Sequence, residues 1–120
     1  MAITRKVLYG HPGDSSTQRA TGAVAISTTV APGVAWQLEE IRLHLDAAGG
    51  AGATNFTATL DHGTGATYDL LIVDKDLTTA TDVIFQPDRP MEFLPDDELD
   101  IAWANAGTKT YGLEIVYKGI

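Results

Sequence analysis

The sequence predicts an all-β protein, an eight-stranded antiparallel jelly-roll sandwich preceded by an extended N-terminal arm. From residue 21 onward, short apolar runs are separated by Gly, Pro, Asn and Asp, which is the spacing of antiparallel sandwiches and barrels. Several runs alternate apolar and polar residues with period 2, as half-buried strands do. Eight strands in roughly 100 residues match the jelly roll, in which two Greek keys form two packed sheets. A lectin-like or immunoglobulin-like sandwich is the alternative.

The expected domain organisation follows from length, turn chemistry and charge. A chain of 120 residues has room for one domain with its own core. The strand-like piece Ile3 to Tyr9 is separated from the rest by the polar, turn-forming stretch Gly10 to Gln18. Three basic residues against one acidic residue give residues 1–20 a net charge of +2, so the −8 of the whole chain leaves −10 for residues 21–120. We therefore expect a basic extended arm over residues 1–20 and an acidic sandwich domain over residues 21–120.

The first two predicted strands follow the arm. The first runs from about Gly22 to Val30 and ends at Ala31-Pro32-Gly33. The second runs from about Val34 to Asp46, where apolar and polar residues alternate. A helix is the rival there, because some apolar residues also have helical spacing and the segment contains good helix formers. The strand is preferred because the alternation continues back to Trp36 if Glu39-Glu40 forms a bulge, and no good N-cap precedes Trp36.

The next three strands are expected at Asn55 to Leu60, Thr67 to Val73 and Asp82 to Gln86. The glycine-rich stretch Ala48 to Thr54 leads into the first of them. It lacks the lysine of a phosphate-binding loop, so we interpret it as a flexible connection. The run Leu70-Leu71-Ile72-Val73 predicts that the second of these strands is covered on both faces, by the core or by an interface.

The last three strands are expected at Met91 to Leu94, Glu98 to Trp103 and Thr110 to Lys118. In the final two, apolar residues alternate regularly with polar ones, so one face of each should pack on the core. Asn105-Ala106-Gly107 lies between them and predicts a hairpin turn.

Composition excludes several classes of function. The net charge of −8 and the sequence pI of about 4.5 argue against nucleic-acid binding, which depends on neutralising phosphates. The absence of Cys excludes disulfides, thiolate zinc sites and cysteine nucleophiles. The first residues lack the apolar region of a signal peptide, and no apolar run has the length of a membrane span. We therefore expect a soluble chain that is not exported through a signal peptide.

Candidate catalytic and metal-binding groups are few. The histidines are His11, His44 and His62, and no serine lies in a nucleophile elbow, so a Ser-His-Asp triad is not expected. The acidic stretches Asp74-Lys75-Asp76 and Asp96-Asp97-Glu98 offer carboxylates to calcium, but neither has the EF-hand spacing. Solvated loop ends and turn caps explain them better, so we predict no metal site and no cofactor.

Six aromatic residues offer a different binding chemistry, because rings with polar edges suit carbohydrate ligands. All six lie inside strand patterns, so packing in the core or in a subunit interface is the preferred interpretation. They are Trp36, Tyr68, Phe85, Trp103, Tyr111 and Tyr117.

Several segments of the last five sixths of the chain carry a resemblance to a known family. They are Trp36-Gln-Leu-Glu-Glu-Ile-Arg-Leu-His-Leu45, Phe56-Thr-Ala-Thr-Leu-Asp-His-Gly63, Tyr68-Asp-Leu-Leu71, Val83-Ile-Phe-Gln-Pro87 and, above all, Phe93-Leu-Pro-Asp-Asp-Glu-Leu-Asp-Ile101 followed by Asn105 and Tyr111-Gly-Leu-Glu-Ile115. In strand order and turn type, the chain resembles the small jelly-roll virion proteins of tailed bacteriophages. These are head decoration (cement) proteins and related tail or fibre modules. The family works through surfaces, so the resemblance carries over no catalytic residue.

The resemblance implies a non-enzymatic virion structural protein, and most specifically a capsid decoration protein that binds the outer capsid surface and stabilises the head. It implies a homotrimer whose partners are the major capsid protein or other virion proteins, with no nucleic acid and no membrane. Such a protein assembles in the host cytoplasm and is released in the virion by lysis. The arm fits this function, because its backbone donors can extend a neighbour's sheet and its cations complement acidic surfaces. The expected arm contacts are Arg5, Lys6, Tyr9, His11 and Arg19.

Two other classes of function stay open. One is a receptor- or carbohydrate-binding module on a phage head or tail. The other is an enzyme, including a cupin-like metal enzyme on the same kind of barrel. Cupins need clustered histidines on facing strands, whereas His44 and His62 each stand alone in the sequence.

Overall fold

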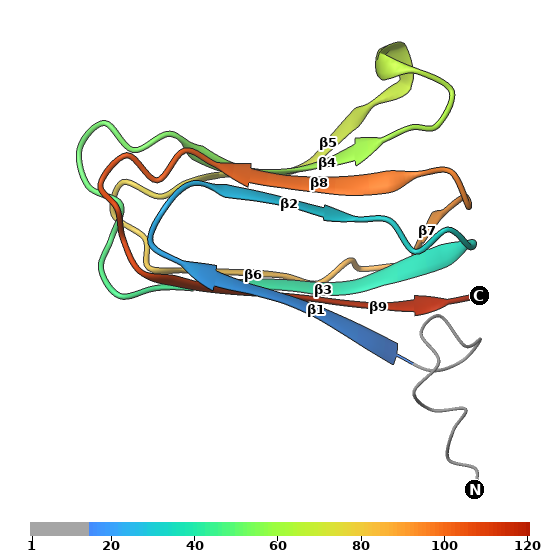
Figure 1. The fold of residues 1–120 in the computed structure, drawn as a ribbon, viewed down its shortest axis with the longest axis horizontal. Coiled ribbons are helices and arrows are strands. Elements are labelled where there is room, and N and C mark those ends of the chain that lie inside the picture. Colours follow the sequence, from blue (N-terminus) through green and yellow to red (C-terminus); the bar gives the residue numbers. More distant parts are fainter. Residues whose placement is uncertain (1–14) are drawn as a thin grey trace, which may run out of the picture.

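The structure is a computed structural model that describes residues 15–120, and the regular secondary structure of these residues is almost entirely β-strand (Figure 1). In chain order the elements are β1 (Ser15–Gly22), β2 (Ile26–Val30), β3 (Trp36–Leu45), β4 (Asn55–Asp61), the short 3₁₀ helix η2 (Ala66–Tyr68), β5 (Leu70–Asp76), β6 (Asp82–Phe85), β7 (Met91–Phe93), β8 (Glu98–Trp103) and β9 (Tyr111–Gly119). The predicted all-β class is confirmed. Among residues 15–120, no helix has the length and hydrophobicity of a membrane span.

The strands form two antiparallel sheets that face each other (Figure 1). The first sheet has the order β1-β9-β3-β6. The strand β7 also belongs to this sheet, because it pairs with the first part of β3, whereas β6 pairs with the later part of β3. The second sheet has the order β2-β8-β4-β5. Figure 1 shows β5 and η2 bending away from the rest of the sandwich at one end. The molecule is therefore a two-layered sandwich whose second sheet flares at the β5 edge.

Most of β1 lies within residues 1–20, which were expected to form the arm, and its last two residues extend into the predicted sandwich domain. It pairs with β9 over its whole length, from Ser15 opposite Lys118 to Gly22 opposite Tyr111. The described residues thus form nine strands, so the predicted count of eight is wrong by one. The expected strand from Gly22 is also shorter, because Gly22 ends β1 and β2 begins at Ile26. β1 is hard to recognise because its residues alternate between exposed and half-buried, and none is fully buried.

The sheet pairings confirm one local prediction and overturn another. The register of β3 against β9 shifts between Leu38 and Glu40, where the sequence predicts a bulge. The hairpin predicted at Asn105–Gly107 is wrong, because β8 pairs with β2 and β4 whereas β9 pairs with β1 and β3. The segment between β8 and β9 crosses from one sheet to the other. Turn-forming residues mark a reversal of the chain but do not say which sheet the next strand joins.

The space between the sheets is filled by apolar side chains from both. The largest fully buried residues are Trp36, Phe56, Phe93, Ile26, Leu38, Ile41, Leu43, Leu45, Leu77, Leu99, Ile101 and Ile115. At one end of the core the rings of Trp36 and Phe93 stack, with centroids 4.1 Å apart. The alternation of β3 and β8 thus places their apolar faces inward, as predicted.

Asn105 fastens the crossover between β8 and β9. Its φ of 52° lies in the left-handed region, and its side chain is buried. Its Nδ2 group donates to the carbonyl oxygens of Val24 and Lys109, both at 2.9 Å, and its Oδ1 accepts from the Lys109 N–H at 2.8 Å. One amide side chain therefore holds this crossover against the loop between β1 and β2.

Candidate functional site

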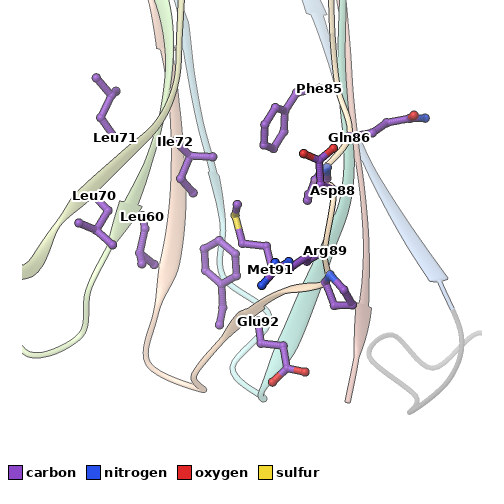
Figure 2. Close-up of a pocket in the computed structure, with 13 residues that line it drawn as sticks. Leu60, Leu70, Leu71, Ile72, Phe85, Gln86, Asp88, Arg89, Met91 and Glu92 are labelled. Atoms are coloured by element: carbon purple, nitrogen blue, oxygen red, sulfur yellow. The ribbon is translucent and has the colours of Figure 1, made fainter.

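An open groove of about 880 Å³ lies between the two sheets, on the side where β5 faces β6 and β7. Figure 2 shows Leu60 and Ile72 of one sheet and Phe85 and Met91 of the other directed into it. Its lining also includes exposed charged residues, namely Asp88, Arg89 and Glu92. The groove thus combines an apolar interior with a charged border, which suits an amphipathic segment of protein.

β5 exposes apolar side chains beside this groove. Leu70 and Leu71 are 60% and 57% exposed, and Tyr68 in η2 is 55% exposed. Of the apolar run in β5, Val73 alone is buried, so the prediction that both faces of this strand are covered is wrong within the single chain. The reason is position: β5 is the last strand of its sheet, and its register with β4 shifts after Ala58, where the strand bends outward (Figure 1).

The outer face of the first sheet carries a ladder of ion pairs. Arg19 Nε in β1 donates to Glu114 Oε2 in β9 at 2.8 Å, and Arg42 Nη2 in β3 donates to Glu114 Oε1 at 2.9 Å. The hydrogen bond from Arg19, followed by the charges of both arginines, lowers the pKa of the Glu114 carboxyl. Both oxygens of Glu114 are therefore committed to joining three adjacent strands.

A hollow of about 510 Å³, lined by charged side chains and by apolar residues such as Ile84, lies on the same face. Gly112 belongs to its lining, and no atom lies within 4 Å of the place where a Cβ of this residue would sit. His44 Nδ1 and Asp82 Oδ1, 2.7 Å apart, form one wall. Hydrogen bonds from Thr81 and then His44 lower the pKa of Asp82. Paired polar groups around an open depression can hydrogen-bond a sugar or a small polar ligand.

Three carboxylates gather on the second sheet. Oxygens of Asp61, Glu98 and Asp100 lie within 4.8 Å of one another. A hydrogen bond with the Asp100 carboxyl, and secondarily burial and neighbouring negative charges, raises the pKa of Asp61. These oxygens have the chemistry to hold a hard cation such as calcium. Sequence reasoning considered Glu98 for calcium but missed its grouping with Asp61 and Asp100, because only the register that places Asp61 opposite Glu98 brings β4 and β8 residues together.

Two residues of the acidic stretches considered for calcium, Asp76 and Asp97, accept hydrogen bonds from the backbone. Asp97 is buried, and its two carboxylate oxygens accept hydrogen bonds from the N–H groups of Gly63 and Leu94. Asp76 Oδ1 accepts from both the N–H and the hydroxyl of Thr78, at 2.8 and 2.7 Å. The interpretation of these stretches as turn caps is therefore supported for Asp76 and Asp97.

The predicted arm contacts fall on both sides of the described boundary. Arg19 lies in β1, where its guanidinium is paired with Glu114. The remaining four lie outside the described residues; they are Arg5, Lys6, Tyr9 and His11. Of the five predicted arm contacts, the structure thus describes Arg19 alone, and this residue is part of the first sheet.

The six aromatic residues do not share one surface. Trp36, Trp103 and Tyr111 are buried in the core, Phe85 and Tyr117 pack against it, and Tyr68 is exposed. Tyr68 lies beside His62, with ring centroids 5.6 Å apart. Packing, the preferred interpretation, thus accounts for five of the six rings.

The two described histidines are not brought together. His44 lies in β3 of the first sheet and pairs with Asp82. His62 directly follows β4 of the second sheet, and its Nδ1 accepts a hydrogen bond from the Thr64 N–H at 3.0 Å. His44 therefore has its partner on the neighbouring strand β6, and His62 has its partner within its own loop.

Comparison of the chain with protein-family models, with curated proteins and with solved structures gives no match.

Proposed function

We propose that the two sheets form a jelly roll. Support comes from the strand order, in which β1-β9-β3-β6 faces β2-β8-β4-β5. Since β6 and β7 pair with successive parts of β3, they count as one interrupted strand, and each sheet then has four strand positions. Most connections, including those on both sides of β2 and of β8, pass from one sheet to the other.

On this fold we propose a non-enzymatic virion structural protein of a tailed bacteriophage, a decoration (cement) protein that binds the outer capsid surface. The observation that carries this proposal is the exposed apolar surface of Tyr68, Leu70 and Leu71 beside the groove, at the free edge of β5. Large exposed apolar patches on soluble chains mark protein contacts. The resemblance of the sequence to phage decoration proteins supplies the kind of assembly in which such a surface would work.

The proposed partners are the major capsid protein, other virion proteins and further copies of the chain in a homotrimer. Arg5, Lys6, Tyr9 and His11 remain predicted contacts. Arg19 is a weaker candidate, because its guanidinium already joins β1 to β9 through Glu114.

The test is made on particles of the phage whose genome encodes this chain. Particles are purified from a lysate on a density gradient, and the protein is quantified by mass spectrometry against the major capsid protein. We expect a fixed ratio of the chain to the capsid protein in DNA-filled particles. Absence of the chain from washed particles would overturn the proposal.

A second measurement separates a cement protein from another virion component. Particles from a phage with the gene deleted should release DNA at a lower temperature than wild-type particles, followed with a DNA-binding dye. Purified full-length protein added back is the matched control and should restore the wild-type temperature. Equal release temperatures with and without the chain would contradict the cement function and leave a tail or fibre module.

The hollow over Gly112, which combines charged side chains with apolar surface, favours a second candidate, a carbohydrate-binding module. A glycan array is expected to give binding that Gly112→Thr removes, because the new side chain would fill open space in the hollow. Ala102→Thr, an exposed change on β8, is the control and should bind as the unmodified protein does. An array without specific binding would eliminate this candidate.

A further inference from the structure

We propose that the N-terminal segment Ile3–Tyr9 of one copy adds as a strand to the free edge of β5 in a neighbouring copy and places apolar side chains in its groove. This inference rests on the proposed function only in treating the protein as a homo-oligomer. It names the surface through which the copies join. The occupant is a second copy of this chain.

The acceptor is the edge of β5. Within the described residues, β5 is the last strand of its sheet, so the backbone groups on its outer side face no other strand. An extended segment that pairs with such an edge gains main-chain hydrogen bonds, and the pockets alongside select its side chains. Here the groove provides the pocket, and Leu70 and Leu71 provide apolar surface on the strand itself.

The donor matches the acceptor in length and pattern. β5 has seven residues, and Ile3–Tyr9 also spans seven. In an added strand, Ile3, Arg5, Val7 and Tyr9 would share one face, because side chains two positions apart point to the same side, and Arg5 on this face could pair with the acids that border the groove. That face would meet the apolar interior of the groove, where Phe85 and the other lining residues lie (Figure 2).

Charge favours the same pairing. The donor carries Arg5 and Lys6, whereas exposed acids flank the acceptor. These acids are Asp74 and Asp76 in β5 and Asp88 and Glu92 on the opposite wall. Opposite charges on two edges steer their association and fix its register.

The position of the chain start favours a neighbouring copy as the acceptor. Register partners run in one row across the first sheet, from Ser15 through Lys118 and Gln37 to Glu92. The chain therefore enters β1 at the same end of the sandwich as the groove but on the opposite edge of the sheet. Three strand spacings, about 14 Å, separate the two edges.

This arrangement produces head-to-tail association. When the β1 edge of one copy lies beside the β6–β7 edge of the next, the start of β1 is next to the neighbour's groove. The 14 residues before Ser15 reach up to about 46 Å when extended, more than this contact needs. Head-to-tail contacts repeated around a rotation axis close into a ring, which is the symmetry of the proposed trimer.

Cross-linking tests the proposal directly, because the chain contains no Cys. Val7→Cys is made in an affinity-tagged chain and Leu70→Cys in an untagged chain, and the two are mixed, allowed to exchange and treated with a short bis-maleimide. We expect covalent tagged–untagged pairs. Val34→Cys replaces Leu70→Cys as the matched control, because Val34 is 41% exposed, lies at the same end and does not line the groove.

The expected result is that Leu70→Cys cross-links about tenfold faster than Val34→Cys, the ratio given by a docking free energy of about 1.4 kcal/mol. Equal rates would overturn the proposal. A chain carrying both Val7→Cys and Leu70→Cys provides the other decisive outcome. If it cross-links only within itself, the segment occupies its own groove and the proposal is wrong.

Deleting the N-terminal segment tests the same contact through the oligomer mass, without introducing a new side chain. A protein lacking residues 2–14 retains β1 and should lose the oligomer, so its mass by light scattering falls to that of one chain. An unchanged oligomer mass would contradict the proposal. The particle experiment remains independent, because a chain found on capsids without cross-linking at β5 would refute this contact and leave the virion function standing.

Discussion

Asp97 shows how one buried carboxylate can hold two loops at one end of the sandwich. Its oxygens accept from Gly63 in the β4–η2 loop and from Leu94 in the turn before β8. The two loops approach so closely that a Cβ on Gly63 would lie 2.6 Å from the Cβ of Asp96. Gly63 is therefore required for this approach, and the Asp97 carboxylate accepts a backbone hydrogen bond from each of the two loops.

Asp97→Ala is expected to lower the free energy of unfolding by about 2 kcal/mol, because it removes the two hydrogen bonds that the backbone N–H groups of Gly63 and Leu94 donate to a buried carboxylate. Chemical denaturation followed by tryptophan fluorescence would measure the change. Asp96→Ala, one residue earlier and exposed, is the control and should change stability by about 0.5 kcal/mol or less. Equal effects of the two substitutions would show that Asp97 does not act through these bonds.

Glu114 predicts a dependence of stability on pH. Its carboxyl has a pKa lowered from the usual value of 4.5, mainly by the hydrogen bond from Arg19. A carboxyl with a lowered folded-state pKa contributes stability above its unfolded value, and that contribution is lost as pH falls below 4.5. The melting temperature of Glu114→Gln should thus lie below that of the unmodified protein at pH 7, and the difference should vanish in acid. A constant difference across this range would argue against the ion-pair ladder.

Among the elements, β1 limits which deletions can test the arm, because this strand begins at Ser15, inside the segment expected to be the arm. A deletion of residues 1–20 removes most of β1, breaks its pairing with β9 and removes the contact of Gln18 with the carbonyl of Thr29 in β2. A deletion that ends at residue 14 leaves the described sheet whole. The arm and the sandwich therefore have to be separated before Ser15 to learn what the arm does.

We expect the protein lacking residues 2–14 to keep the circular dichroism spectrum and the cooperative unfolding of the full chain, while losing particle binding. The protein lacking residues 2–22 should unfold at a clearly lower temperature, because β9 loses an entire paired strand. If the shorter deletion also lost cooperative unfolding, residues before Ser15 would belong to the folded core. Retained particle binding by the shorter deletion would refute the arm contacts.

The contrast between β8 and β5 shows what the sequence can predict. In β8 the alternation itself reports burial, with Leu99, Ile101 and Trp103 inward, so its bounds were predictable. In β5 a run of apolar residues predicts burial but does not identify the surface that would cover it. The structure shows β5 to be an edge strand of its sheet. Local pattern thus predicts a strand and its inward face, whereas neighbours depend on the whole topology.

The candidate sites depend on that topology even more. The groove forms where Leu60 of one sheet and Met91 of the other line the same opening, and the acidic cluster forms where Asp61 lies opposite Glu98. The two residues of each pair are far apart in the sequence, so no local motif predicts either site. Turn caps such as Asp76, which bonds to Thr78 two residues later, were predictable because both partners lie in one short segment.

For the whole molecule, we expect a solution mass of about 38 kDa by light scattering, three times the 12.7 kDa of one chain. The pair Leu70→Thr and Leu71→Thr should reduce this mass to one chain, because it removes apolar surface from the free edge of β5. Leu94→Thr, equally exposed at 60% but outside the groove, is the control and should leave the mass unchanged. A single-chain mass for the unmodified protein would contradict the trimer.

The interruption between β6 and β7 bears on how far the protein can polymerise. Pro87 and Pro90 stand in this gap, and proline has no N–H with which to continue a ladder. The far edge of the first sheet is therefore two short pieces, too brief to template an endless stack of identical chains. This edge therefore favours finite assemblies over fibres.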